Sequence, residues 1–133
     1  MIKAEILLLT AGKSSRMGQP KALLSIKGIS DQLQQYNDDH SMEESDLLKA
    51  LDRETHQKVL QPRMLSGSYQ GRLLALLAKM IGPKKILEVG TYTGYATLCM
   101  AEGLTTGGSI DTIDHNEELA DMQRRYFDQS PYG

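Results

Sequence analysis

The sequence has few of the residues that mark secreted or membrane proteins. Its one cysteine, Cys99, cannot form a disulfide within the chain, and the short apolar run at residues 6–9 lacks the layout of a signal peptide. No apolar run approaches the roughly 20 residues that a membrane-spanning helix needs. Tryptophan is absent and phenylalanine occurs once, although the 40% hydrophobic and 24% charged fractions are those of a folded soluble domain. We therefore expect a cytoplasmic protein without a membrane partner.

Charge divides the chain into two stretches. Residues 1–28 carry five Lys or Arg against one Glu, whereas residues 29–133 carry ten against sixteen acids. At 133 residues the chain is long enough for one ordinary domain and too short for two complete ones. The sequence therefore predicts a junction near Gly28, with residues 1–28 and 29–133 as separate units.

Helical patterns occupy the first half of the second unit. Ser41 and Glu44 have the spacing of a capping box, in which the serine accepts from a backbone amide and the glutamate reaches back. A helix is expected to follow, and Pro62 should interrupt it. Residues 70–81 present a broad apolar helical face, and Gly82 with the proline after it should end that helix.

Strands and helices alternate in the second half. The pattern predicts strands at residues 84–89 and 109–114, with helices at residues 95–102 and 117–128, the latter capped by Asn116. A right-handed crossover makes the two strands parallel. The expected fold class is α/β, a partial Rossmann-like fold in three layers with a parallel sheet of few strands.

A glycine-bearing turn follows the first of these strands. Gly90 and Gly94 let the backbone pass close to a ligand at the carboxyl end of the sheet. Asp114 ends the next strand, where an acid can accept hydrogen bonds from both hydroxyls of a ribose. Glu88 would repel a phosphate but could receive the ammonium of an amino acid. The combination of nucleoside and amino acid describes S-adenosylmethionine.

Five short motifs occur in a fixed order through the second unit: Arg53-Glu54-Thr55, Gln61-Pro62-Arg63-Met64, Gln70-Gly71, residues 86–95 and Thr112-Ile113-Asp114. With these motifs residues 29–133 resemble the N-terminal half of the cation-dependent O-methyltransferases, the group that includes catechol and caffeoyl-coenzyme A methyltransferases. The resemblance implies S-adenosylmethionine-dependent methylation of a small hydroxylated acceptor.

The same resemblance implies a set of cofactor-binding residues. Asp114 is expected to hold the ribose and Ser66 to contact the methionine end, while Ala96 stands where the family usually has a serine. The full set is Ser66, Glu88, Gly90, Thr91, Gly94, Ala96 and Asp114.

Metal chemistry is expected to be missing from this chain. In the family a divalent cation is held by two aspartates and an asparagine from later strands, and it polarises the acceptor hydroxyls. We expect those ligands, together with the C-terminal half of the fold, to be absent here, so that no metal site forms and the chain alone is inactive. The expected partners are a small-molecule acceptor and, as one option, a second copy of the chain; nucleic acid is not expected.

The first 28 residues resemble a different family. Residues 9–24, LTAGKSSRMGQPKALL, are similar to the opening of the molybdenum-cofactor-type nucleotidyltransferases, in which Arg16 and Lys21 could neutralise phosphate. The alternative function is therefore a nucleotidyltransferase that uses a nucleoside triphosphate, and a non-catalytic fused or truncated fragment is a further alternative. We also expect a strand at residues 5–9 that pairs beside residues 86–89.

Several other residues have ordinary interpretations. His40, His56 and His115 lack the spacing of metal ligands, so surface or capping roles are expected. Met64 and Tyr69 could border the cofactor or pack in the core.

Overall fold

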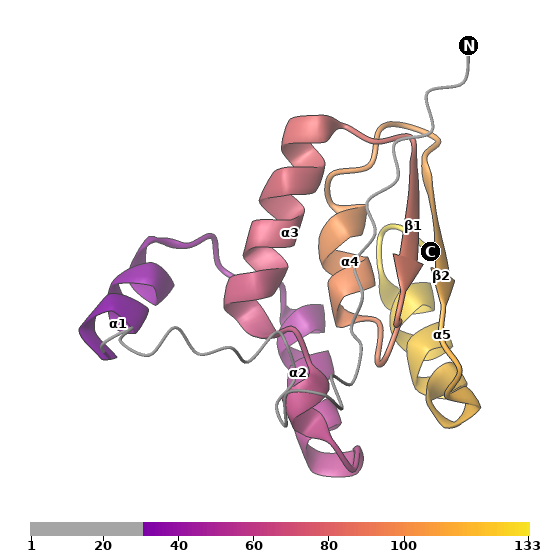
Figure 1. Ribbon diagram of the computed structural model, residues 1–133, viewed down its shortest axis with the longest axis horizontal. Coiled ribbons are helices and arrows are strands. Elements are labelled where there is room, and N and C mark those ends of the chain that lie inside the picture. Colours follow the sequence, from indigo (N-terminus) through magenta and orange to yellow (C-terminus); the bar gives the residue numbers. More distant parts are fainter. Residues whose placement is uncertain (1–30) are drawn as a thin grey trace, which may run out of the picture.

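The computed structural model describes residues 31–133 (Figure 1). The predictions for residues 1–28, including the strand at residues 5–9 and its pairing beside residues 86–89, lie outside the described residues. The elements follow in chain order as α1 (Asp31–His40), α2 (Asp46–Lys58), the 3-10 helix η2 (Pro62–Met64), α3 (Gly67–Ile81), β1 (Lys85–Val89), α4 (Tyr95–Ala101), β2 (Ser109–Ile113), the 3-10 helix η3 (Glu117–Leu119) and α5 (Ala120–Gln129).

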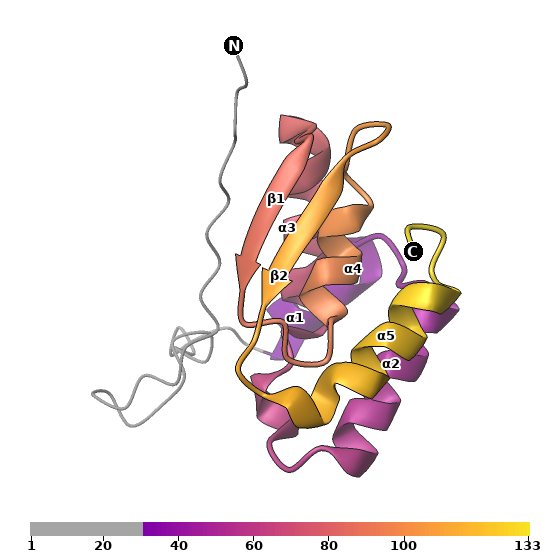
Figure 2. The same cartoon turned by 90° about the vertical axis from the view of Figure 1, so that its right-hand side faces the viewer.

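β1 and β2 form a parallel pair. Lys85 aligns with Ser109 and Val89 aligns with Ile113, and α4 makes the crossover that a parallel pair requires. Figure 2 shows α3 and α4 behind the two strands, so both helices cover the same face of the sheet. The predicted α/β class and few-stranded parallel sheet are confirmed. Of the three predicted layers, the described residues provide the sheet and the helical layer on one face.

α4 lies at the centre of the hydrophobic core. Its side chains contribute to one cluster with α2, α3 and α5 and to another with α3 and β1. The close approach of α3 to α4 requires Gly71, because a Cβ there would lie 2.7 Å from both Cys99 Sγ and the Tyr95 ring. Burial raises the pKa of the Cys99 thiol to about 11, so Cys99 packs in the core as an uncharged side chain.

The capping box predicted at Ser41 is wrong. α2 begins later, and its N-cap is Ser45, whose side chain accepts a hydrogen bond from the Leu48 amide at 3.3 Å. Glu44 instead accepts a hydrogen bond from the Tyr95 hydroxyl of α4. The tertiary contact with α4 therefore takes the glutamate that the local pattern assigned to the cap.

The other helix ends agree closely with the sequence. α2 ends at Lys58, so no helix continues through Pro62, which instead begins η2. α3 begins at Gly67, before the predicted residue 70, and ends at Ile81. Gly82 follows in the left-handed conformation with φ 58°, which a glycine adopts without steric cost.

α2 and α5 lie side by side and are joined through Glu54 (Figure 2). Its carboxylate accepts hydrogen bonds from Lys58 at 2.9 Å, Arg125 at 2.8 Å and the Tyr126 hydroxyl at 2.7 Å. These donors, Lys58 first, lower the pKa of Glu54 to about 2. The ionised carboxylate of Glu54 therefore links α2 to α5.

Candidate functional site

A cavity of about 520 Å³ opens at the carboxyl ends of β1 and β2. Its walls are the end of α2 with η2, the turn after β1, and the segment from the end of β2 into α5. The lining residues are Lys58, Val59, Leu60, Gln61, Met64, Gly90, Tyr92, Asp114, His115, Asn116, Glu118, Leu119 and Met122. Cavities of this size and position are typical of small-molecule sites in open α/β sheets.

Asp114 is a partly buried acid on the wall of this cavity. Its Oδ2 accepts a hydrogen bond from the Tyr92 amide at 2.6 Å, and its Oδ1 accepts one from the Asn116 amide at 2.9 Å. The side chain is only 14% exposed. Because a carboxylate offers about four acceptor sites, two remain for a ligand. The two backbone amides therefore hold a charged acceptor in place at the cavity wall.

Tyr92 joins three walls of the cavity, a role that the sequence analysis missed. Its hydroxyl donates to the Gln61 carbonyl at 2.8 Å, and its own carbonyl accepts from Gln123 Nε2 at 2.6 Å. Its φ of 51° is the left-handed conformation that only a few per cent of non-glycine residues adopt. Burial raises the pKa of its hydroxyl, which keeps Tyr92 a neutral donor. No local pattern in the sequence announces a left-handed tyrosine.

Glu88 lies beneath the turn and does not line the cavity. It is 2% exposed, and its Oε2 accepts hydrogen bonds from Thr97 at 2.5 Å and Thr112 at 2.7 Å. The Thr112 and Thr91 hydroxyls are 2.6 Å apart. Since Thr112 gives its single proton to Glu88, Thr91 must be the donor to Thr112. We call Glu88, Thr91, Thr97 and Thr112 the buried hydroxyl network.

Burial is the main cause that raises the pKa of Glu88, with the nearby charge of Asp114 acting in the same direction. The two threonine donors oppose this shift because they stabilise the carboxylate. Because Glu88 Oε2 already accepts hydrogen bonds from two protein hydroxyls, we assign Glu88 a structural role beneath the turn that follows β1.

The predicted site residues therefore separate into two groups. Gly90, with φ 100°, and Asp114 line the cavity, whereas Glu88 and Thr91 belong to the buried hydroxyl network. Gly94 has φ 90°, and a Cβ there would lie 2.6 Å from the Phe127 ring, so this glycine is explained by packing against α5.

Of the remaining predicted residues, Ala96, Ser66 and Tyr69 lie away from the cavity lining and Met64 belongs to it. Ala96 packs in the core with Ile86 and Met100, and Ser66 is the N-cap of α3 without a side-chain capping bond. Met64 lines the cavity, whereas Tyr69 is 59% exposed at the beginning of α3.

The described part of the chain contains neither a metal-ion site nor a membrane-spanning helix. Within residues 31–133 no three His, Cys, Asp or Glu side chains are grouped so that they could hold a metal ion. None of the described helices has the length and apolar character needed to cross a bilayer.

Comparison with known proteins assigns the class. The family described as O-methyltransferase matches residues 38–133, so the chain belongs to the O-methyltransferase family. This confirms the resemblance stated for the second unit. The match does not include residues 1–28, whose resemblance to nucleotidyltransferases stays a prediction.

Individual relatives agree with this class. Over 91 residues the chain is 40% identical to caffeoyl-CoA O-methyltransferase 1 of Zea mays, covering 67% of this chain and 35% of that protein. It is 33% identical over 63 residues to a catechol O-methyltransferase of Mycobacterium tuberculosis, covering 47% and 29% of the two chains. The chain thus spans about a third of the length of these curated relatives.

Solved structures show the same fold. The O-methyltransferase from Bacillus cereus in complex with SAH (S-adenosylhomocysteine) superimposes with a TM-score of 0.65 and 32% identity, over 71% of this chain and 42% of that one. An SAH-bound methyltransferase from Podospora anserina gives a TM-score of 0.68 and 26% identity, over 74% and 43%.

Proposed function

We propose that this chain binds S-adenosylmethionine, or its product S-adenosylhomocysteine, in the cavity at the ends of β1 and β2. The observation that carries the proposal is Asp114, a charged acceptor held by two backbone amides on the wall of a cavity of about 520 Å³. Membership of the O-methyltransferase family, and solved relatives bound to SAH, support this choice of ligand. The function served is O-methylation of a small hydroxylated acceptor.

The lining residues fit the parts of this ligand. The carboxylate of Asp114 receives the ribose hydroxyls, and Gly90 lets the backbone approach the ligand closely. Apolar side chains at Met64, Leu119 and Met122 offer a surface for the adenine ring. Glu88 and Thr91 do not contact the ligand in this proposal. They contribute indirectly, because the buried hydroxyl network holds the turn that carries Tyr92.

The cofactor brings a methyl group on a positively charged sulfur, which an acceptor oxygen attacks. The described residues bind and orient this donor. They do not fit a divalent cation, since residues 31–133 contain no group of three His, Cys, Asp or Glu side chains that could hold one.

The assembly and location follow as parts of the same proposal. We place the protein in the cytoplasm, where a lone buried thiol such as Cys99 stays reduced. Residues 1–28 form a separate unit from the methyltransferase domain that begins at residue 29. The chain works as a homodimer.

Titration of S-adenosylhomocysteine by calorimetry tests the proposal. Asp114→Asn should weaken binding roughly 10- to 150-fold, as expected when a charge-assisted hydrogen bond worth about 1.5–3 kcal/mol is lost. Asp111→Asn is the matched control, since Asp111 is an exposed acid on β2, the strand that ends just before Asp114, and does not line the cavity. Equal affinity of the two variants, or no binding by the unmodified chain, would contradict the proposal.

A further inference from the structure

Gln123 is a residue of α5 that lies next to the cavity without lining it. It follows Met122, which belongs to the lining, and its own side chain is partly buried. Its Nε2 lies 2.6 Å from the Tyr92 carbonyl oxygen. Because a carbonyl oxygen can only accept a hydrogen bond, the nitrogen of the side-chain amide is the atom that faces it. One side chain of α5 therefore holds the backbone of the turn that follows β1.

The backbone of Tyr92 is held by hydrogen bonds on both sides of its α-carbon. Its amide donates to Asp114 Oδ2 at 2.6 Å, and its carbonyl accepts from Gln123. Since φ and ψ are the two soft rotations at that carbon, bonds to both flanking peptide groups fix both angles. Within residues 31–133 Tyr92 is the only non-glycine residue with a positive φ, at 51°. This conformation is unfavourable for a residue with a Cβ, so contacts from outside the turn must maintain it.

The geometry of Asp114 depends on this backbone conformation. A return of Tyr92 to negative φ would rotate its two peptide groups against each other, so the bonds to Asp114 and Gln123 could not both be kept. The bond from the Tyr92 hydroxyl to the Gln61 carbonyl fixes the side chain and leaves the orientation of these peptide groups open. Without the Tyr92 amide, Asp114 would retain the Asn116 amide at 2.9 Å, and a ligand would have to order the carboxylate on binding.

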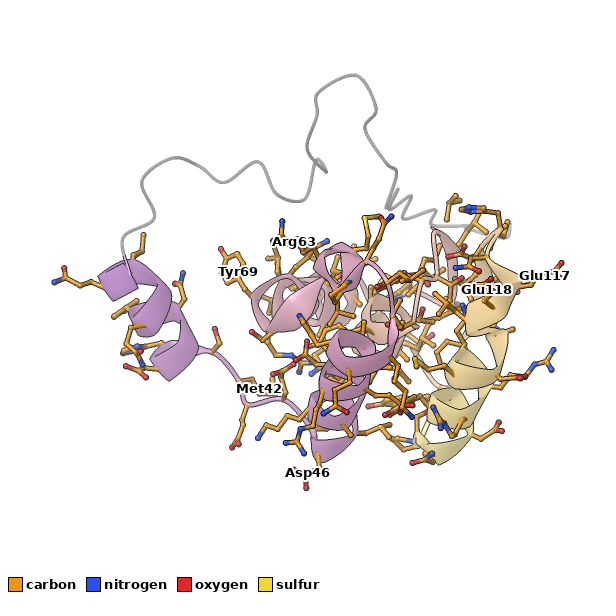
Figure 3. The ribbon with its side chains drawn as sticks, turned by 90° about the horizontal axis from the view of Figure 1, so that it is seen from below. Met42, Asp46, Arg63, Tyr69, Glu117 and Glu118 are labelled. Carbon is orange, nitrogen blue, oxygen red and sulfur yellow. The ribbon has the colours of Figure 1, made fainter. Side chains whose placement is uncertain are left out.

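We propose that Gln123 is a positioning residue for cofactor binding, which keeps Tyr92 in the left-handed conformation so that the Tyr92 amide directs the Asp114 carboxylate toward the ribose hydroxyls. The inference rests on the proposed function and adds a residue that contacts no part of the ligand. Figure 3 shows Glu118, which lines the cavity, together with Glu117 where the chain enters α5, at the end of the molecule opposite α1. Gln123 therefore links α5 to the ribose-binding acid through Tyr92.

Calorimetry of the full chain with S-adenosylhomocysteine tests this role. Gln123→Met keeps the length of the side chain and removes the amide, so it should weaken binding roughly two- to tenfold, as expected for one neutral hydrogen bond. Gln129→Met is the matched control, because Gln129 also lies on α5 but donates to the Arg125 carbonyl of its own helix at 2.9 Å. The control should bind like the unmodified chain. Thermal melting confirms that each variant is folded.

Hydrogen exchange of single amides in the ligand-free chain, followed by NMR, separates positioning from general loosening. Gln123→Met should accelerate exchange of the Tyr92 amide, whose bond to Asp114 depends on the held conformation. The Leu98 amide, which bonds to the Gly94 carbonyl at 3.0 Å, should keep its rate. Equal acceleration at both amides would mean that Gln123 only stabilises the fold, and would overturn the positioning role.

The two measurements also separate this inference from the proposed function. Binding of S-adenosylhomocysteine that is the same in Gln123→Met and Gln129→Met refutes the role of Gln123 and leaves the cofactor site intact. An unmodified chain that does not bind S-adenosylhomocysteine refutes the cofactor site, and with it any role of Gln123 in binding, even if the Tyr92 amide responds to the substitution.

Discussion

The cavity and the buried hydroxyl network occupy successive positions on the same face of the same two strands. Glu88 and Thr112 are paired in register, and Gly90 and Asp114 lie two residues further along. The pair Glu88 and Thr112 is shielded from any ligand, because Glu88 is only 2% exposed and accepts its hydrogen bonds from protein hydroxyls. Asp114, in contrast, lines the cavity. An acid near the end of a strand is thus available to a ligand only if it lies beyond the last turn that covers the sheet.

The largest expected effect concerns the turn that separates the two regions. Gly94→Ala should lower the free energy of unfolding by about 2–4 kcal/mol, because a side chain is strained at φ 90° and its Cβ would lie 2.6 Å from the Phe127 ring. Gly107→Ala is the control: φ is 72° but no atom lies within 4 Å, so only the backbone cost of about 1 kcal/mol remains. Urea denaturation measures both. Equal losses would show that the Phe127 contact contributes nothing.

Next comes the network itself. Thr112→Val keeps the shape of the side chain and removes the hydroxyl that links Thr91 to Glu88, which should cost about 2 kcal/mol of stability. Thr106→Val, at an exposed turn, should be neutral. If the buried hydroxyl network is energetically separate from the cavity, folded Thr112→Val should bind S-adenosylhomocysteine with nearly the affinity of the unmodified chain. An affinity loss larger than the stability loss would show instead that the network belongs to the binding site.

A smaller effect is expected at Glu54, where α2 packs on α5. Glu54→Gln should lower stability by about 1 kcal/mol at pH 7, because it weakens the link between α2 and α5. The pKa of Glu54 is lowered to about 2, so this contribution is present above the ordinary value of 4.5 and is lost as pH falls toward 2. Denaturation at several pH values, beside the exposed control Glu117→Gln, checks this. A difference in stability between Glu54→Gln and the unmodified chain that does not change with pH would contradict a role for the ionised Glu54 carboxylate.

The smallest expected change in stability is an increase. The pKa of Glu88 is raised from 4.5, so its ionised form is disfavoured in the folded protein, and stability is lost as pH rises above 4.5 through the folded pKa. Glu88→Gln retains an acceptor oxygen for the two threonines and should therefore be slightly more stable than the unmodified chain at pH 7, and no more stable near pH 4. Thermal melts across this range decide it. A variant destabilised equally at all pH values would mean that the charge on Glu88 supports the network.

Part of the candidate site could be predicted from the sequence. Gly90 and Asp114 follow strands whose apolar patterns are local, so their place at one edge of a parallel sheet could be inferred. Most of the opposite wall could not, although Met64 was one candidate to border the cofactor. Leu60 and Gln61 come from a segment with no periodic signal, and it is brought to the cavity by the packing of α2 on α5 and by the Tyr92 hydroxyl. The Ser41 prediction failed for a related reason, since the contact between Glu44 and Tyr95 joins distant parts of the chain.

The sequence by itself determined the order of the elements, the C-terminal end of α3 and the parallel strands, because apolar periodicity and glycine conformation act over a few neighbouring residues. Tertiary structure decided which acid faces the ligand. Glu88 and Asp114 both lie at or next to the end of a strand, and only the hydroxyls of Thr97 and Thr112, delivered by α4 and β2, enclose the first of them. The depth of a side chain beneath a covering turn depends on contacts between elements, which no local pattern encodes.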